Sequence, residues 1–333
     1  MLACRQMPLP LFSAAFASWR AAHDLVAEAP ARKPAIDAVV KLSIKTLPQA
    51  RTAETLGAER EGSGIVITAD GLIVTIGYLV LESESILVLT PDGRVFPAVT
   101  VGFDHATGFG LIRATKGVAQ HPLALGDSAD LLEFEQAMAV THPAAGGLTP
   151  AYVVSRRRFT GYWEYMIDDA IFTAPPRFDH SGAALMDRSG RLVGVGSLWV
   201  GDALNTGVAF PGNMFVPIDL LKPVLDELIT HGRRREPARP WLGVYTEEVE
   251  SHVVVTRVLP DAPAAEAGLR RGDVILGVGG QSIGGQGEFY QRLWASGAAG
   301  EDVVLHILRS KTVQQLRVRS VDRLAYLRVR PVS

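Results

Sequence analysis

The chain has 333 residues, 47% hydrophobic and 20% charged, which suits two or three small globular domains and excludes a disordered chain. Its formal net charge of −2 gives no reason to expect nucleic acid or a strongly charged surface as a partner. Cys4 is the only cysteine, which excludes an intrachain disulfide. A single cysteine fits either a cytosolic protein or a bacterial envelope protein that does without disulfides.

The N-terminal residues allow two interpretations. Arg5 precedes an apolar stretch from Leu9 to Ala17, which ends in small residues and resembles a short signal peptide. Pro8 and Pro10 interrupt this stretch, and it is too short to cross a membrane. A signal segment and a simple N-terminal extension are both open, and no other segment is long and apolar enough to span a bilayer.

A β pattern begins at Val39. Short alternating or apolar runs are expected to form strands at 39–44, 62–67, 72–75, 85–90, 95–102, 109–114 and 137–141, with a loop at 48–61. Asp70-Gly71 and Pro91-Asp92-Gly93 lie between such runs and predict tight hairpin turns. Many short strands with almost no helical periodicity predict an antiparallel sandwich or a pair of barrels.

Ser181 stands at the entrance of a further predicted hairpin. Ser181-Gly182 leads into Leu185-Met186, and a turn at 187–190 separates these residues from the apolar run 192–195. A serine in such a turn can present its hydroxyl as a nucleophile while nearby backbone N–H groups face an oxyanion. Most serines of this kind only satisfy the backbone of the turn, so the stretch alone leaves both interpretations open.

One strong helix is predicted near the middle of the chain. Asp219 can cap it, Gly232 can end it, and Pro223 lies in its first turn. Its apolar face is expected to comprise Leu220, Leu221, Val224, Leu225, Leu228 and Ile229. The charged, proline-rich stretch 233–240 follows and predicts a solvated linker between domains.

The C-terminal part mixes strands with short helices. Val253–Val255 is a buried-strand run, and a short helix with a Gly-Asp turn is expected within 262–275. Residues 286–296 are expected to form a helix with Phe289 and Leu293 on one face. The basic alternating run Leu316–Arg319 predicts an edge strand.

These elements, in this order, resemble the HtrA-type serine proteases. Residues 62–67 with Asp70-Gly71 are similar to the family's Gly-Ser-Gly strand and hairpin, and 205–213 to the segment that completes its specificity pocket. The resemblance implies an all-β chymotrypsin-like double β-barrel followed by an α+β PDZ domain. The expected boundaries are an N-terminal extension at 1–36, the trypsin-like domain at 37–232, the linker at 233–240 and the PDZ domain at 241–325.

The resemblance places the nucleophile at Ser181. At the positions of the family's catalytic histidine and aspartate, however, this chain has other residues. The family's Thr-Asn-Ala-His-Val-Val motif aligns with residues 75–80, so Tyr78 takes the position of the histidine base. Gly108 takes the position of the catalytic aspartate, and Asp179 lies at the oxyanion-hole position, where its charge would oppose an oxyanion. A phenol with an ordinary pKa of ~10 is a poor general base at neutral pH.

In the second domain the resemblance assigns peptide binding to the loop Trp241-Leu242-Gly243-Val244. Backbone N–H groups of such a loop hold a peptide's C-terminal carboxylate, and the strand that follows pairs with the peptide. The expected partners are therefore polypeptides with exposed or free C-terminal segments.

Two functions are compatible with these residues. The first is a proteolytically inactive or severely impaired HtrA homologue, a pseudoprotease that binds peptides in protein quality control or regulation. The alternative is an active serine endopeptidase that uses Ser181 with another base, for which His105 and the adjacent His180 are candidates. A third hypothesis is a structural subunit, as a homo-trimer or in co-assembly with an active relative.

No spacing of residues predicts a metal site or a phosphate-binding loop, so we expect no cofactor. The family resemblance favours the periplasm or cell envelope without excluding the cytoplasm.

Overall fold

The computed structural model describes residues 36–114, 117–119 and 121–328, so the signal-peptide interpretation of residues 9–17 lies outside the described residues. The first barrel of the fold closes in the strand order β1-β2-β3-β6-β5-β4. Its strands are β1 (Val39–Thr46), β2 (Glu59–Val66), β3 (Leu72–Ile76), β4 (Ser83–Leu89), β5 (Val95–Phe103) and β6 (Phe109–Ala114). The sequence predicted all six, although the expected loop at 48–61 contains the short helix α3 (Ala53–Leu56) and the start of β2.

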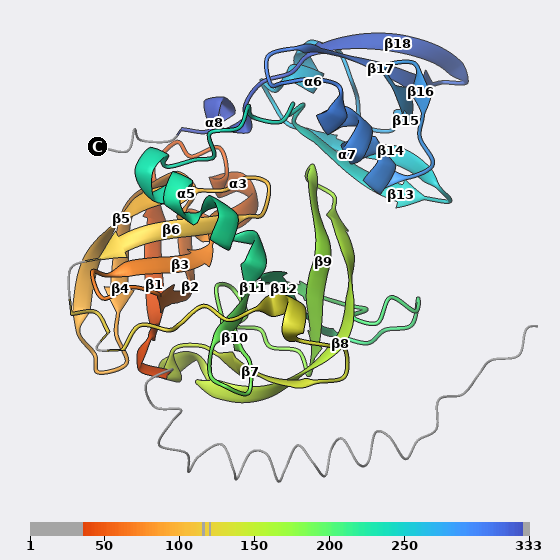
Figure 1. The fold of residues 1–333 in the computed structure, drawn as a ribbon. Helices are drawn as coiled ribbons and strands as arrows, with labels where there is room; N and C mark the ends of the chain where they lie inside the picture. Colours follow the sequence, from red (N-terminus) through yellow and green to blue (C-terminus); the bar gives the residue numbers. More distant parts are fainter. Residues whose placement is uncertain (1–35, 115–116, 120, 329–333) are drawn as a thin grey trace, which may run out of the picture.

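A second barrel closes in the order β10-β11-β12-β9-β8-β7, so the choice between sandwich and barrels is settled as two barrels. Its strands are β7 (Gln136–Val140), β8 (Leu148–Gly161), β9 (Tyr165–Ala174), β10 (Ala184–Met186), β11 (Leu192–Val200) and β12 (Gly212–Pro217). The long β8–β9 hairpin was not predicted, and it extends from this barrel toward the C-terminal domain (Figure 1).

Buried aliphatic side chains from both barrels form one continuous core, which includes Leu42, Ile73 and Leu111 of the first barrel and Ala184 and Val216 of the second. Because the two barrels share this packing, residues at their contact are held in a fixed relation. Short 3₁₀ turns at η2 (Ser128–Asp130) and η3 (Pro143–Ala145) lie in the connections of this region.

The predicted helix at 219–232 is shorter than expected. Two 3₁₀ turns, η4 (Ile218–Leu220) and η5 (Lys222–Val224), precede the helix α5 (Leu225–His231). Asp219 does not cap it, because its carboxylate accepts hydrogen bonds from the Ser128 hydroxyl and the Ala129 N–H instead. The predicted end is confirmed, since Gly232 has a φ of 73° and donates its N–H to the Leu228 carbonyl.

The stretch 233–240 is exposed at residues 235–237 and 239, as a solvated linker should be, but its arginines also contact other parts of the chain. Arg234 forms a two-point ion pair with the carboxylate of Asp104, which is only 2% exposed. Arg239 lies over the ring of Trp294 at 4.7 Å, and Arg233 pairs with Asp322. The sequence could not show these partners, because they come from residues far away in the chain.

A third sheet, with the order β13-β14-β15-β17-β18 and with β16 paired to β15, forms the C-terminal domain. Its strands are β13 (Val244–Val249), β14 (His252–Val258), β15 (Val274–Val278), β16 (Gln281–Ser282), β17 (Asp302–Arg309) and β18 (Thr312–Arg319). Its helices are α6 (Pro263–Glu266) and α7 (Gln286–Ala295), and α8 (Arg323–Tyr326) follows the sheet.

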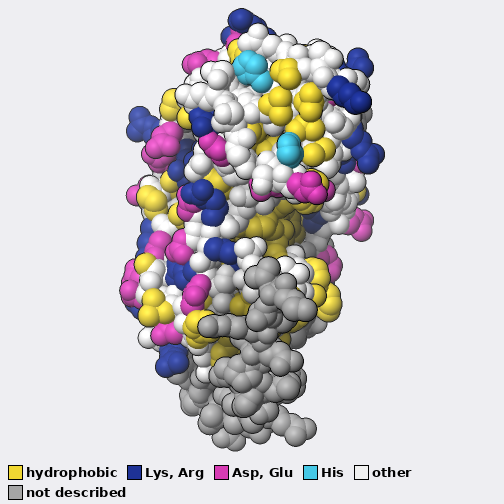
Figure 2. Space-filling model, turned by 90° about the vertical axis from the view of Figure 1, so that its right-hand side faces the viewer, with side chains coloured by type: hydrophobic (Ala, Val, Ile, Leu, Met, Phe, Trp, Pro, Cys, Tyr) yellow, Lys and Arg dark blue, Asp and Glu magenta, His cyan; other side chains and the backbone are white. Residues whose placement is uncertain are grey.

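The predicted helix with Phe289 and Leu293 on one face and the predicted edge strand are confirmed. Phe289 and Leu293 on α7 are fully buried, and β18 lies at an edge of the sheet. Within the residues described, no helix is both long enough and apolar enough to cross a bilayer. Figure 2 shows this domain from the side, above the two barrels.

Candidate active site and peptide-binding loop

The turn that carries Ser181 is held between the two barrels by backbone contacts. The Ser63 N–H of β2 donates to the Ser181 carbonyl at 2.8 Å, and the Gly182 N–H donates to the Gly196 carbonyl of β11 at 2.8 Å. Gly182 has a φ of +74°, and a Cβ at this position would lie 2.0 Å from the Ser63 oxygen. Only glycine fits here. The close packing of Gly182 against Ser63 of β2 therefore keeps Ser181 where the two barrels meet.

Tyr78 lies directly against Ser181. It stands on the single-turn helix α4 (Gly77–Val80), just after β3. Its hydroxyl oxygen is 2.8 Å from Ser181 Oγ and 2.7 Å from the Ser197 carbonyl oxygen. A phenol has one proton and a carbonyl can only accept. When Tyr78 donates to Ser197, it can therefore only accept from Ser181.

Burial raises the pKa of Tyr78 to about 12, although the hydrogen bond with Ser181 acts in the opposite direction. The phenol is therefore neutral at physiological pH. A neutral phenol is a very weak proton acceptor, so this side chain can orient the Ser181 hydroxyl without activating it.

Gly108 lies next to Tyr78 through the backbone, since the Gly77 N–H donates to the Gly108 carbonyl at 2.6 Å. Gly108 has a φ of +82°, and a Cβ there would lie 3.0 Å from the hydroxyl oxygen of Tyr165. Tyr165 is buried and donates to the Thr107 carbonyl at 2.6 Å. The space beside Gly108 is thus filled by a side chain from β9.

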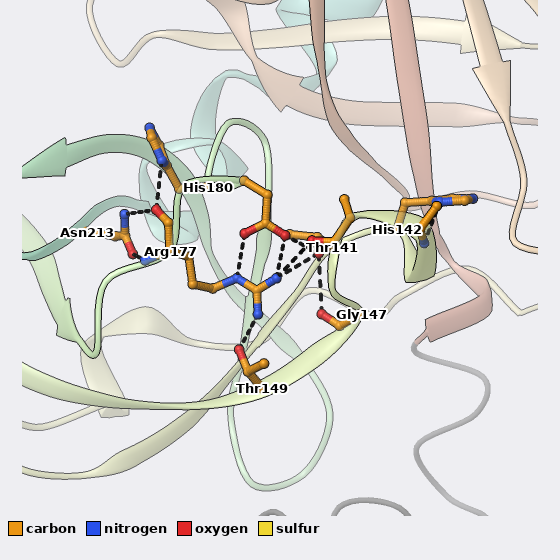
Figure 3. A network of polar contacts seen from close by, with 10 residues as sticks. Thr141, His142, Gly147, Thr149, Arg177, His180 and Asn213 are labelled. Atoms are coloured by element: carbon orange, nitrogen blue, oxygen red, sulfur yellow. Dashed lines mark hydrogen bonds and ion pairs between the residues drawn. The ribbon is translucent and has the colours of Figure 1, made fainter.

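Asp179 does not present a free charge beside Ser181, contrary to the expectation from the sequence. Its carboxylate accepts from Arg177 Nε at 2.9 Å and Nη2 at 2.5 Å, and from the Thr141 hydroxyl at 2.9 Å. Arg177 also contacts Thr149, as Figure 3 shows. This two-point ion pair largely offsets the carboxylate's charge.

Within the part of the chain that the structure describes, neither candidate histidine forms a hydrogen bond with Ser181. The Nδ1 atom of His180 is 3.0 Å from the Arg177 carbonyl, on the side of Asn213 in Figure 3. Burial lowers the pKa of His180. The ring nitrogens of His105 are buried with no hydrogen-bond partner among the described residues. His105 instead lines a cavity of about 90 Å³ between the two domains, together with Arg234 and Trp241.

The predicted carboxylate-binding loop has the expected backbone geometry but already holds a carboxylate. The N–H groups of Leu242, Gly243 and Val244 all donate to the side chain of Glu164, at 3.0, 2.7 and 2.9 Å. Trp241, the first residue of the loop, is buried and packs its ring against that of Tyr326 at 4.8 Å. Glu164 comes from the turn between β8 and β9.

Sequence reasoning missed Glu164, Tyr165 and Arg177. The run Gly161-Tyr162-Trp163-Glu164-Tyr165 places one acid among aromatic residues, which is an unusual composition for an exposed turn. That composition could have indicated that the turn between β8 and β9 is buried, but not that it is buried against the loop at 242–244. Arg177 stands two residues before Asp179, so their pairing was the more accessible prediction.

The sequence matches two domain families. Residues 62–195 match the trypsin-like peptidase domain, and residues 240–319 match the PDZ domain. These ranges contain Ser181 and the loop 241–244, respectively.

Curated relatives are named as serine endoproteases. A probable periplasmic serine endoprotease, DegP-like, of Bartonella henselae is 29% identical over 273 residues, covering 78% of this chain and 52% of the relative. The serine endoprotease DegS of Haemophilus influenzae is 27% identical, covering 77% of this chain and 76% of the relative. The chain spans about half the length of the DegP-like relatives that it matches.

Solved structures show the same fold. The HtrA-type protease AlgW with a decapeptide has a TM-score of 0.53 and 23% identity, covering 90% of this chain and 98% of that chain. The serine endoprotease from Yersinia pestis has a TM-score of 0.52 and 21% identity, covering 88% and 96%. With its two barrels, its third sheet and its two matched domains, the chain has the fold and the domain order of the HtrA-type serine proteases.

Proposed function

We propose that this chain is a pseudoprotease of the HtrA family that binds peptide segments through its PDZ domain. The observation that carries the proposal is the contact of the Tyr78 hydroxyl with Ser181 Oγ at 2.8 Å. In this interpretation Tyr78 replaces the catalytic histidine and Gly108 replaces the aspartate. Ser181 keeps the nucleophile's position without a group that can take its proton.

The expected loss of activity is large. In serine proteases, removal of the base lowers turnover by roughly 10⁶, and removal of the aspartate alone by about 10⁴. The pKa of Tyr78, raised to about 12 by burial, leaves the phenol protonated at neutral pH. Two neutral hydroxyl groups in contact cannot replace an imidazole, because neither holds a proton acceptor of suitable strength.

Peptide binding is supported by the geometry of the PDZ loop. Three backbone N–H groups converge on one carboxylate within 3.0 Å, which is the arrangement that captures a peptide's C-terminal carboxylate. We therefore propose polypeptides with exposed or free C-terminal segments as partners. A role in protein quality control or regulation follows from such partners.

We place the protein in the periplasm or cell envelope, since the DegP-like relatives are named as periplasmic. A homo-trimer or co-assembly with an active relative is part of the same proposal, because a subunit without its own base can still present a PDZ domain. Sedimentation of the purified full chain would give the subunit number.

The test of the proposal is digestion of casein by the full chain beside its Ser181→Ala variant, with an active HtrA protease as positive control. We expect equal, background digestion by the two proteins. Digestion by the wild type that Ser181→Ala abolishes would instead establish an active serine endopeptidase with a base that is neither His105 nor His180 in the positions described.

A further inference from the structure

The tip of the β8–β9 hairpin occupies the PDZ loop. Glu164, at this tip, has a φ of +55° and is 7% exposed, so its backbone turns sharply and its side chain is buried. Its two carboxylate oxygens accept from three consecutive N–H groups, Leu242 on one oxygen and Gly243 and Val244 on the other. This contact joins the two domains, and Figure 1 shows the hairpin reaching toward the C-terminal sheet.

Backbone contacts continue along the groove beside β13. The Thr246 N–H of β13 donates to the Tyr162 carbonyl at 2.9 Å. The Tyr290 hydroxyl of α7 donates to the Gly161 carbonyl at 2.9 Å and accepts from the Glu164 N–H at 3.1 Å. The tip is therefore held by hydrogen bonds from both β13 and α7.

Side chains of the hairpin add to the docking. The ring of Tyr162 packs edge-on against that of Tyr245 with centroids 5.4 Å apart. Met166 packs against the buried core of the PDZ domain. These contacts lie within one chain, so the hairpin is present at a high effective concentration near the groove.

These contacts reproduce the chemistry of C-terminal peptide recognition. A bound peptide places its terminal carboxylate on the loop N–H groups and pairs its backbone with the adjacent strand edge. Here a side-chain carboxylate takes the first role, and the Tyr162 carbonyl takes part of the second. The chain continues beyond Glu164, so the tip fills the site without being a terminus.

We propose that the β8–β9 hairpin tip is an internal ligand of the PDZ groove, and that an external peptide C-terminus binds only after displacing Glu164. This inference rests on the proposed peptide-binding function of the same loop. The apparent affinity for an external peptide is then the intrinsic affinity reduced by the fraction of molecules whose hairpin is released.

Hydrogen exchange tests the docking without any peptide. In the full chain we expect the N–H groups of residues 242–244 to exchange at least about tenfold faster in Glu164→Ala than in the wild type, since hydrogen bonds to a charged group are lost. Asp168→Asn is the matched control. It removes a carboxylate from the same hairpin whose side chain is 70% exposed.

The fully buried Val255 and Ile307 of the PDZ core provide an internal reference, because unchanged exchange there shows that the variant is folded. Glu164→Gln, which keeps the side-chain length, serves as a second variant. Equal protection of residues 242–244 in the wild type and in both folded variants would overturn the proposal.

Peptide binding separates this inference from the proposed function. The probe is a pool of fluorescein-labelled decapeptides with a free carboxylate, ending in Leu, Val, Ile or Phe. We expect Glu164→Ala to bind it at least about tenfold more tightly than the wild type or Asp168→Asn. Equal binding by the wild type and both variants would overturn the proposal that the hairpin tip is an internal ligand, but would still support peptide binding by this loop. Binding by none of them overturns the peptide site and, with it, this inference.

Discussion

The turn that carries Ser181 and the loop from Trp241 to Val244 lie in different domains. In both, side chains of the same chain occupy space: at Ser181 the space that a reaction would need, and at the loop the space that a bound peptide would need. At Ser181 the hydroxyl is contacted by Tyr78, and Tyr165 fills the space beside Gly108. At the loop three backbone N–H groups converge on the side chain of Glu164. Under the proposed function the first site has lost its chemistry, whereas the second is intact but filled.

The two conditions differ in how they can be reversed. Releasing Glu164 requires only that the hairpin moves, because the N–H groups of the loop are unchanged. Under the proposed function, restoring the reactivity of Ser181 requires new side chains. Glu164 and Tyr165 are adjacent in sequence, so one hairpin contributes to both sites.

The largest expected effect concerns the turn at Ser181, which we regard as structurally intact. Gly182→Ala should destabilise the fold by more than ~4 kcal/mol, because its Cβ would lie 2.0 Å from the Ser63 oxygen. Gly190→Ala is the control, since it also has a positive φ but nothing within 4 Å, and it should cost only ~1–2 kcal/mol. Chemical denaturation measures the free energy of unfolding of both variants. Equal losses would show that the packing of Gly182 against Ser63 does not hold the turn.

A second prediction sharpens the claim that the chemistry is lost. Tyr78→His with Gly108→Asp should not restore reactivity, because the new carboxylate side chain would sit on a backbone with a strained φ and meet Tyr165. Adding Tyr165→Phe removes the nearest obstructing atom, and should raise fluorophosphonate labelling of Ser181 by about 10² or more, the usual contribution of a general base.

The double variant and Tyr165→Phe alone are the controls for this triple variant. Labelling of the double variant as fast as the triple would mean that Tyr165 does not obstruct the site. A folded triple variant without labelling would contradict the assignment of Gly108 to the aspartate's position.

A third prediction tests whether the PDZ loop is intact once emptied. In Glu164→Ala, amidation of the decapeptide C-terminus should weaken binding about 10- to 100-fold, since the charge held by the loop N–H groups is removed. Calorimetry of the acid and amide forms measures this difference. Equal affinities would count against the loop as a carboxylate site.

The smallest predicted effect is a pH dependence of peptide binding. Burial raises the pKa of Glu164 from 4.5 to about 7, against hydrogen bonds from the three loop N–H groups and the charge of Arg323, both of which lower it. The docked carboxyl therefore binds a proton more tightly than a released one. Docking is favoured by acid and weakens as the pH rises through about 7.

Binding of a histidine-free decapeptide to the wild type should accordingly strengthen by about tenfold from pH 6 to pH 8. Glu164→Gln should lose this dependence, because the neighbouring Tyr290 and Arg323 do not titrate in this range, and burial holds the pKa of His105, which lines the same cavity as Glu164, well below it. The pKa of Tyr290 is raised to about 12 by burial. A slope that persists in Glu164→Gln would assign the effect to another group.

The sequence predicted the parts of this structure that depend on local patterns. The Asp70-Gly71 turn, the hairpin after Ser181 and the end of α5 at Gly232 follow from turn and cap residues, and the structure confirms them. The positions of Ser181, Tyr78 and Gly108 came from short motifs, and the structure brings these three residues together.

The remaining features depend on contacts between distant residues. Asp219 was assigned to a helix cap because Ser128, its actual partner, lies far back in the chain. Glu164 and the loop at 242–244 belong to different domains, so no local pattern connects them. Three arginines at 156–158 also broke the apolar alternation by which β8 would have been recognised.

The most direct test of the account is fluorophosphonate labelling of Ser181 in Glu164→Ala, measured by mass spectrometry beside the wild type and an active HtrA protease. The account holds that Ser181 has lost its base, so releasing the hairpin should leave it unlabelled in both forms of the chain. Rapid labelling in Glu164→Ala but not in the wild type would contradict this, because it would show a working site that the docked hairpin keeps inactive.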